Sequence, residues 1–306
     1  MQKRSIGSLE VSVVGIGCNN FGVRSDAATT NAVVAAAIDA GINFFDTADI
    51  YGATKSEVFL GEALRSRRSE VVVATKFGMP IDDDHFGAAP AYVRQACDNS
   101  LKRLGSDYID LYQLHAPDDK VPITDTLGAL RELVGAGKVR EIGCSNLTVA
   151  QLREAKAAAG NGPAFVSIQN QYSLLARDPE RDGVLDVCDE LGLGFLPYYP
   201  LANGLLTGKV RPGEPVPEGS RLARMAPERS AHWLGDRLRA QVDALVQYSE
   251  EIDVPLLSLA FSWLLSHPQV SCVIAGASSA AQVEANAHAV RILSAEQLGA
   301  LNSLAV

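Results

Sequence analysis

The chain has 306 residues, 47% of them hydrophobic, so a sizeable core is possible without disulfides or structural metal. It carries 27 Lys and Arg against 36 Asp and Glu, a net charge of −9 that disfavours nucleic acid or an anionic membrane as a partner. The five cysteines are scattered without a CxxC pair, and no apolar run is long enough to cross a bilayer. We therefore expect a cytoplasmic protein with free thiols, and the oligomeric state stays open.

The predicted elements alternate between short apolar strands and amphipathic helices. Residues 3–12 are typical of a small β-hairpin, and a strand follows near 13–16. Asp26 is a predicted helix N-cap, and Gly41 ends that helix before the strand at 42–45. The remaining helix and strand pairs are 56–65 with 71–74, 90–105 with 108–112, 122–134 with 139–143, 148–159 with 164–168, and 181–191 with 194–196, before a last strand at 270–274.

This alternation predicts a parallel sheet, and about eight repeats of the unit favour a closed (β/α)8 TIM barrel. We expect one α/β domain spanning residues 1–306, with the N-terminal β-hairpin capping the barrel bottom. The stretch 203–235, rich in Pro, Gly and Arg, interrupts the rhythm after the seventh strand. Its length indicates a functional loop, because regular structure resumes beyond it.

Polar side chains follow six successive strands, at the ends where such barrels carry their active sites. These residues are Asp46, Asp49 and Tyr51; Thr75 and Lys76; Gln113 and His115; Ser145 and Asn146; Gln169 and Asn170; Tyr198 and Tyr199. Solubility alone does not require such a concentration of polar groups on one rim. The sequence therefore predicts a site there.

Four of these residues make a chemically coherent set for reducing a carbonyl group. A phenol such as Tyr51 is a poor proton source near neutrality unless a nearby cation stabilises its anion. Lys76 can supply that charge, Asp46 can keep the lysine charged and oriented, and His115 can hydrogen-bond the carbonyl oxygen. No metal is needed. The alternative for Asp46 and Lys76 alone is a structural ion pair at the rim.

The order of these motifs along nearly the whole chain resembles the aldo-keto reductase family. The resemblance rests on Asp46-Thr-Ala-x-x-Tyr51-Gly, Ala74-Thr-Lys76, His115-x-Pro-Asp, Gly143-Cys-Ser145-Asn146, Gln169-Asn-Gln-Tyr-Ser, Tyr198-Tyr-Pro200-Leu201, Gly204-Leu-Leu-Thr-Gly208 and Ala275-Gly276-Ala-Ser278. It implies that Tyr51 is the proton donor, that Lys76 and Asp46 tune it, and that His115 orients the carbonyl.

The same resemblance implies a nicotinamide cofactor, NADP with NAD as the alternative, extended across the barrel mouth. Its carboxamide would be held by Ser145, Asn146 and Gln169, its ring by Tyr198, its pyrophosphate by the backbones of Leu201, Gly204 and Leu206, its adenosine by Gly276, Ser278, Gln282 and Asn286, and its 2′-phosphate by Lys209 and Arg221. Two departures from the family pattern, Ala275 for Pro and Ala285 for Glu, fall near the adenosine end. Gln282 or Ser278 stands where many members have a phosphate-binding Arg.

Other patterns carry weaker hypotheses. The glycines from Gly15 to Gly22 resemble a dinucleotide fingerprint, but the third glycine is misplaced. Asp82-Asp83-Asp84-His85 suggests a metal site, although consecutive acids are usually a solvated surface. Ser145 and Asn146 are also typical of a turn before the next helix. Phe21, Phe77, Phe86 and Trp233 are candidates for apolar walls of a substrate pocket.

The main prediction is therefore an NADPH-dependent reductase of small aldehydes or ketones that works by direct hydride transfer. An NAD-linked aldose or polyol dehydrogenase is the alternative within the same class of enzyme. A nicotinamide-binding regulatory subunit of the same fold is the alternative from a different class, because fold does not fix function.

Overall fold

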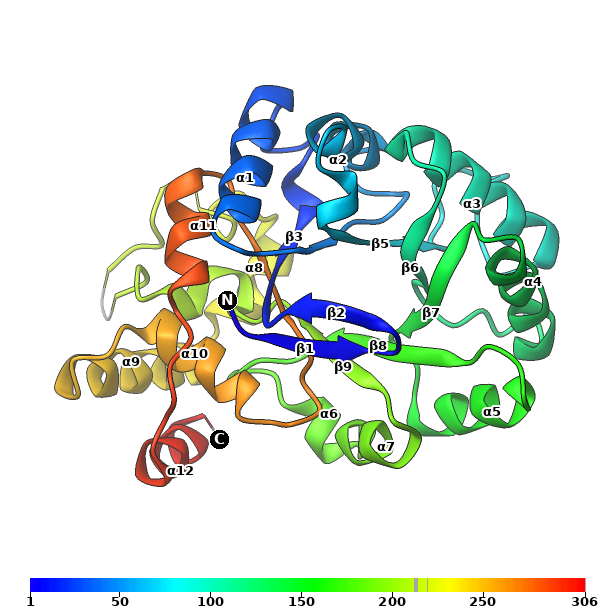
Figure 1. The fold of residues 1–306 in the computed structure, drawn as a ribbon. Coiled ribbons are helices and arrows are strands. Elements are labelled where there is room, and N and C mark those ends of the chain that lie inside the picture. The colour runs from blue at the N-terminus through cyan, green and yellow to red at the C-terminus, as the bar shows by residue number, and fades with distance from the viewer. Residues whose placement is uncertain (212–213, 219, 306) are drawn as a thin grey trace.

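Eight parallel strands neighbour one another in chain order and close into a ring in the computed structural model, which describes residues 1–211, 214–218 and 220–305 (Figure 1). The strands are β3 Val14–Gly17, β4 Phe44–Asp46, β5 Val72–Phe77, β6 Ile109–Leu114, β7 Val139–Ser145, β8 Phe165–Gln171, β9 Gly194–Tyr198 and β10 Val273–Gly276. The ring closes where Phe195 of β9 pairs with Val270, just before β10. The predicted α/β barrel is confirmed.

Helices surround this ring on the outside (Figure 1). They are α1 Ala27–Asp39, α2 Lys55–Leu64, α3 Pro90–Leu104, α4 Ile123–Gly135, α5 Val149–Ala159, α6 Asp178–Arg181, α7 Val184–Leu191, α8 Pro227–Leu234, α9 Asp236–Glu251, α10 Leu256–Leu265, α11 Ala280–Ala287 and α12 Ala295–Leu304, with short 3₁₀ turns η1 Cys18–Asn20, η2 Arg68–Glu70 and η3 Ala202–Thr207. Within the described ranges, no helix has the length and apolar character needed to span a membrane.

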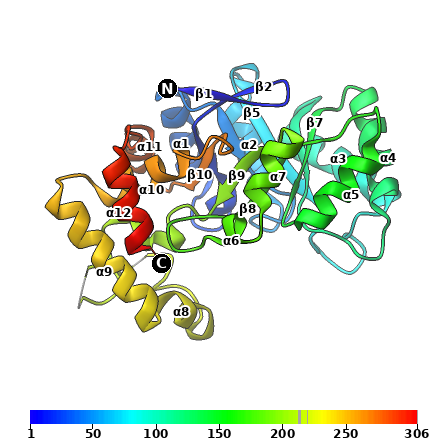
Figure 2. The same cartoon turned by 90° about the horizontal axis from the view of Figure 1, so that it is seen from below.

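The N-terminal hairpin closes one end of the barrel. Its strands, β1 Lys3–Ile6 and β2 Leu9–Ser12, pair antiparallel. Ile6, Leu9 and Val11 are buried in one cluster with side chains from the barrel interior. Figure 2 shows this hairpin at the opposite end of the molecule from α8. Because the hairpin covers the end of the barrel opposite α8, the candidate site is expected at the other end, where the strands have their C-terminal residues.

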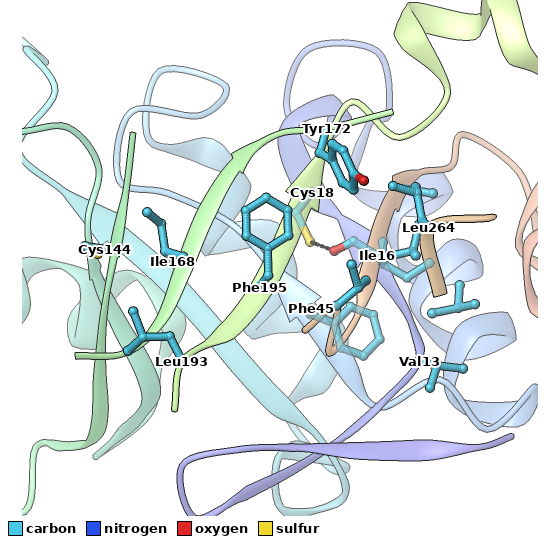
Figure 3. Packing of buried hydrophobic residues seen from close by; sticks show 14 of the residues in the cluster. Val13, Ile16, Cys18, Phe45, Cys144, Ile168, Tyr172, Leu193, Phe195 and Leu264 are labelled. Carbon is cyan, nitrogen blue, oxygen red and sulfur yellow. Dashed lines mark hydrogen bonds between the residues drawn. The ribbon is translucent and has the colours of Figure 1, made fainter. Parts of the chain in front are cut away.

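Side chains alternate along each strand between the barrel interior and the surrounding helices, as the period of two requires. Phe44 and Leu111 belong to the small interior cluster. Their neighbours Phe45 and Tyr112 belong to the larger cluster between strands and helices, part of which Figure 3 shows. Continuing the inward series by two residues leads from Phe44 to Asp46. The interior is therefore apolar below and polar at the top.

The structure corrects three sequence predictions. The helix predicted at 181–191 begins only at Val184, as α7, because Gly183 adopts a left-handed φ of 77°, while Arg181 ends the short helix α6. The last strand begins at Val273 rather than at residue 270, and Val270 makes an isolated bridge. The stretch 203–235 contains most of η3 and all of α8, whose first residue is Pro227.

A glycine sets how closely α2 approaches the end of α3. A Cβ atom on Gly61 of α2 would lie 2.3 Å from the backbone carbonyl oxygen of Leu104, the last residue of α3. Backbone at that distance cannot move aside without shifting a helix. Gly128 of α4, by contrast, has no atom within 4 Å of the same added carbon.

We expect Gly61→Ala to lower the free energy of unfolding by about 2–3 kcal/mol, because overpacking outweighs the better helix propensity of alanine. Gly128→Ala is the matched control and should gain about 0.5–1 kcal/mol from propensity alone. Denaturant titration of both variants checks this. Equal effects of the two substitutions would contradict the packing argument.

A carboxyl group, that of Asp49, is buried in the segment that follows β4. Asp49 is 1% exposed, and neither of its carboxylate oxygens has a hydrogen-bond partner within the described part of the chain. Burial first, and the negative charge of Glu57 second, raise the pKa of Asp49 to about 7, while Arg103 and Lys76 oppose the rise. Asp49 therefore holds a proton in the folded state over a pH range in which the unfolded chain has lost it.

Since the pKa of Asp49 rises from 3.8 to about 7 on folding, the folded state binds more protons between these values, and stability falls as pH rises through this window. Asp49→Asn cannot ionise and should remove that slope. At pH 8 the variant should be more stable than the wild type, by up to about 4 kcal/mol at roughly 1.4 kcal/mol per unit. Unfolding free energies at pH 5 and pH 8 test this, with exposed Asp83→Asn as the control. A slope that survives in Asp49→Asn would contradict the assignment.

Candidate active site

An ion pair lies at the top of the barrel interior. The Lys76 ammonium on β5 contacts Asp46 Oδ2 at the end of β4 at 2.7 Å, and both side chains are almost fully buried. Lys76 also donates to the backbone carbonyl of Thr47 at 2.9 Å. Although burial favours the neutral amine, the charge of Asp46 holds the pKa of Lys76 above its ordinary value. The lysine is therefore a fixed buried cation.

Two side-chain amides hold the second oxygen of Asp46. Gln169 of β8 donates through Nε2 to Oδ1 at 2.9 Å, and Gln113 of β6 donates to the same atom at 3.2 Å. Gln169 was a predicted site residue, whereas Gln113 was noted only as a polar residue of the rim. Gln113 lies two residues after the inward-facing Leu111 and therefore also faces the barrel interior. This can be recognised only when the register of the strand is known.

The predicted proton donor lies beside this cation. The Lys76 ammonium is 5.2 Å from the centroid of the Tyr51 ring. Burial raises the pKa of Tyr51, and the charge of Lys76 works against that rise. Tyr51 is therefore a neutral phenol whose anion would form next to a positive charge, as the tetrad hypothesis requires.

His115, in the loop after β6, completes the set. Its ring meets the Tyr51 ring edge-on, with centroids 5.8 Å apart and planes at 80°. Burial, followed by the charge of Lys76, lowers the pKa of His115 to about 3, so the imidazole is neutral. Its Nδ1 is buried without a partner among the described residues. A neutral imidazole carries one N–H and can donate it to a carbonyl oxygen.

The predicted nicotinamide residues form one hydrogen-bonded group at the rim. Ser145 Oγ donates to the Gln169 carbonyl at 2.6 Å. Asn146 donates through Nδ2 to the His115 carbonyl at 3.0 Å, and its Oδ1 accepts from the Tyr198 hydroxyl at 3.0 Å. Asn146 has a φ of 62°, a conformation that asparagine tolerates well. Asn146, which could have been only a turn residue, thus ties the loop that carries His115 to Tyr198.

The chain after β9 follows an unusual backbone path. Tyr199, Ala202, Asn203 and Gly204 all have positive φ values. Such clusters of left-handed residues gather at functional sites, where they aim backbone N–H groups at a ligand. Leu201, Gly204 and Leu206, the predicted pyrophosphate residues, are in or next to this segment. A side chain at Gly204 would meet no atom within 4 Å, so the backbone is approachable there.

Basic side chains gather near this turn. Arg221 donates to the Tyr199 hydroxyl at 3.1 Å, and its guanidinium carbon lies 4.8 Å from the Tyr199 ring centroid. The positive charges of Arg221 and Arg224, after burial, lower the pKa of Arg24, which places the three arginines within electrostatic range. None of them, nor exposed Lys209, pairs with a carboxylate among the described residues. Unpaired cations of this kind fit an anionic group such as a phosphate.

The residues predicted for the adenosine end lie after β10. Ser278 donates through its backbone N–H to Gln282 Oε1 at 2.8 Å, across the start of α11. Asn286 is buried, and its Nδ2 has no partner among the described residues. Exposed Gly276 ends β10, where an added Cβ would be 3.2 Å from Asn20 Nδ2. These groups suit a polar ligand, so the site as a whole fits a dinucleotide.

The weaker hypotheses come out differently. Asp82 accepts the backbone N–H groups of Asp84 and His85 and contacts the His85 ring at 2.7 Å, so this exposed loop bonds within itself. Phe21 and Phe77 are fully buried and do not line an open pocket. The prediction that Phe77 lines the pocket is wrong. Lys76 points into the barrel, so the next side chain, Phe77, points outward and stacks on Tyr112.

Gly15 has a packing role rather than a phosphate-binding one. A Cβ atom there would lie 2.8 Å from Cys272 Sγ and 2.9 Å from the Phe44 ring. Since this glycine lies within β3, close packing of the barrel interior accounts for it. The rejection of a dinucleotide fingerprint at this position is therefore consistent with the structure.

A separate cavity of about 360 Å³ lies outside the barrel wall, beside Leu114, between the loop after β6 and helices α4 and α5. The buried or partly buried polar groups around it are engaged within the protein. Asp118 accepts from the Ala88 and Lys120 backbones, and Thr126 donates to the Ala88 carbonyl. The tetrad, not this cavity, is the candidate reaction site.

Comparisons with known proteins show the family to which the chain belongs. The sequence profile of the Aldo/keto reductase family matches residues 13–306. The chain is 34% identical to "Probable aldo-keto reductase 1" of Glycine max over 94% of its length and 83% of that protein's. It is 33% identical to "Probable voltage-gated potassium channel subunit beta" of Arabidopsis thaliana over 96% of its length and 92% of that protein's.

Among solved structures, aldo-keto reductase AKR11C1 from Bacillus halodurans in its holo form superposes with a TM-score of 0.81 at 33% identity, covering 99% of this chain and 96% of that one. The match runs through every strand that carries the tetrad. The chain therefore belongs to the aldo-keto reductase family.

Proposed function

We propose that the protein is an NADPH-dependent reductase that converts small aldehydes or ketones to alcohols. The observation that carries the proposal is the tetrad. A buried Lys76–Asp46 ion pair of 2.7 Å lies beside the Tyr51 phenol, and His115 meets that phenol edge-on. Reduction needs a hydride at carbon and a proton at oxygen. The nicotinamide supplies the hydride when bound, and this chain's residues deliver the proton.

In this proposal Tyr51 is the general acid. As the substrate oxygen gains negative charge, the phenol passes its proton to it and becomes a phenolate. Lys76, held by Asp46 and by the Thr47 carbonyl, stabilises that phenolate without having to move. The neutral imidazole of His115 donates a hydrogen bond to the same substrate oxygen and fixes its position.

The choice of NADPH rests on charge. Arg221 and Lys209, without carboxylate partners among the described residues, suit the 2′-phosphate that distinguishes NADP from NAD. Ser145, Asn146 and Gln169 would hold the carboxamide, Tyr198 the ring, and the backbone around Gly204 the pyrophosphate. The NAD-linked polyol or aldose dehydrogenase is the alternative that the same tetrad supports.

A nicotinamide-binding regulatory subunit is the candidate from a different class of protein. It is favoured by the 33% identity to a plant protein named as a probable channel β subunit. The intact tetrad favours the enzyme. Turnover on a panel of aldehydes, ketones and sugars separates the two, because a regulatory subunit would bind the nucleotide and leave it unoxidised.

We expect Tyr51→Phe to bind NADPH within about twofold of wild type and to lose turnover by about 10²–10⁴-fold, since only the proton donor is removed. Fluorescence titration and NADPH oxidation with an aromatic aldehyde measure both effects. The matched control is Tyr112→Phe, which deletes a buried hydroxyl with no partner in the described structure and should keep full turnover. Near-normal turnover of Tyr51→Phe would remove the proton-donor role.

We also expect the protein to bind NADPH more tightly than NADH. Lys209→Ala should weaken NADPH binding by about tenfold and leave NADH nearly unchanged, because the lost charge would face only the 2′-phosphate. Arg221→Ala should weaken NADPH more than NADH, although its lost contact with Tyr199 beside the pyrophosphate turn affects both nucleotides. Arg237→Ala, an exposed arginine of α9, is the control. Equal weakening of both nucleotides would assign these cations to the shared pyrophosphate instead.

A further inference from the structure

The interior position occupied by Gln113 is unusual for a barrel. Interior layers are dominated by branched apolar side chains, and two residues earlier on the same strand Leu111 follows that rule. Gln113 is fully buried, and its Nε2 donates to Asp46 Oδ1 at 3.2 Å. A polar side chain in this layer needs a reason beyond packing, because burial of an amide is unfavourable unless it is hydrogen-bonded.

The amide is only half satisfied. Gln113 Oε1 is buried without a partner among the described residues, an arrangement that is unfavourable because the oxygen has lost its water. The neighbouring strand makes room for this side chain, since a Cβ atom on Gly143 would lie 3.2 Å from Gln113 Cγ and 2.5 Å from Ser167 Oγ. A leucine would fill the space without the unpaired oxygen. The unpaired oxygen is offset by the hydrogen bond that the nitrogen of the same amide donates to Asp46.

Asp46 has two oxygens with different partners. Oδ2 faces Lys76 at 2.7 Å, while Oδ1 accepts from both Gln113 and Gln169. Under the proposed function Gln169 also has to hold the cofactor carboxamide, so its amide serves two partners. Gln113 is not among the residues that the family resemblance places on the nucleotide. It can therefore hold Asp46 in the same way before and after the nucleotide binds.

We propose that Gln113 is a positioning residue for the proposed carbonyl reduction. It fixes Asp46 Oδ1 so that Oδ2 stays on Lys76, and it thereby keeps the ammonium placed for the Tyr51 phenolate. Gln113 acts through Asp46 and contacts neither substrate nor cofactor. This inference rests on the proposed function, and its tests include one that does not need turnover.

Gln113→Leu removes the donor and the unpaired oxygen together at similar volume, so the fold should be retained. We expect kcat for aldehyde reduction to fall about tenfold, while KM and the NADPH dissociation constant stay within twofold of wild type. Ser167→Ala is the matched control, a buried interior hydroxyl without a hydrogen-bond partner in the described structure, and should keep wild-type kcat. A kcat within twofold of wild type in Gln113→Leu would overturn the inference, as would an equal loss in Ser167→Ala.

Gln113→Glu supplies the second readout. Two carboxyl groups in contact cannot both ionise easily, so the introduced group should hold a proton and donate it to Asp46 in place of the amide. Infrared difference spectra of Gln113→Glu against wild type at pH 7, in which the band of protonated Asp49 cancels, should then show an added protonated carboxyl band that Gln113→Leu lacks. The kcat of this variant should exceed that of Gln113→Leu at pH 6. An ionised carboxylate at pH 7, or equal kcat values at pH 6, would contradict the placement against Asp46.

The two proposals fail in different ways. If wild type oxidises no NADPH with any carbonyl compound, yet the added band appears, the proposed reductase is wrong and the contact between Gln113 and Asp46 stands. If wild type turns over and Gln113→Leu matches it, the reductase stands and the positioning role is wrong.

Discussion

The Lys76–Asp46 ion pair is the interaction on which the active end of the barrel depends. Both charges are almost fully buried, and their 2.7 Å contact is supported by hydrogen bonds from Gln113 and Gln169 and to the Thr47 carbonyl. Buried ion pairs rarely contribute net stability, because desolvation offsets much of the attraction. A pair so fully satisfied is better explained by what it does to its neighbours. It places a permanent cation beside Tyr51, and the charge of Lys76 adds to the effect of burial in keeping His115 neutral.

The strand period of two builds this arrangement. Inward positions run from apolar to polar along the chain in β4 and β6, from Phe44 to Asp46 and from Leu111 to Gln113. The hairpin seals the apolar end with Ile6, Leu9 and Val11. Water is thereby excluded from the hairpin side of the ion pair, and the polar groups around it face the C-terminal ends of the strands. A low-dielectric wall strengthens each electrostatic interaction at the mouth.

Much of this was predictable from the sequence, because caps, glycines and apolar runs are local signals. The barrel, the hairpin and the four tetrad residues follow from alternation and motif order. Register across strands is not local, and that is why Gln113 was not assigned and Phe77 was assigned wrongly. The start of the helix predicted at 181–191 was wrong for a different reason. Gly183 has a left-handed backbone angle that the sequence pattern does not reveal, and the regular helix begins only after it, at Val184.

The backbone at the mouth of the barrel also depends on contacts that the local sequence does not reveal. The segment from Tyr199 to Gly204 has left-handed backbone angles at Tyr199 and Ala202, residue types that rarely adopt them, as well as at Asn203. Such strain persists only when surrounding contacts determine it, here the Tyr198 bond to Asn146 and the Arg221 contact with Tyr199. The loop after β6, through Asn146, and the segment that carries Arg221 thus meet at Tyr198 and Tyr199, whose rings pack edge to face 5.2 Å apart. The backbone strain at the barrel mouth is therefore held by contacts between segments that lie far apart in the sequence, and local sequence signals cannot predict such contacts.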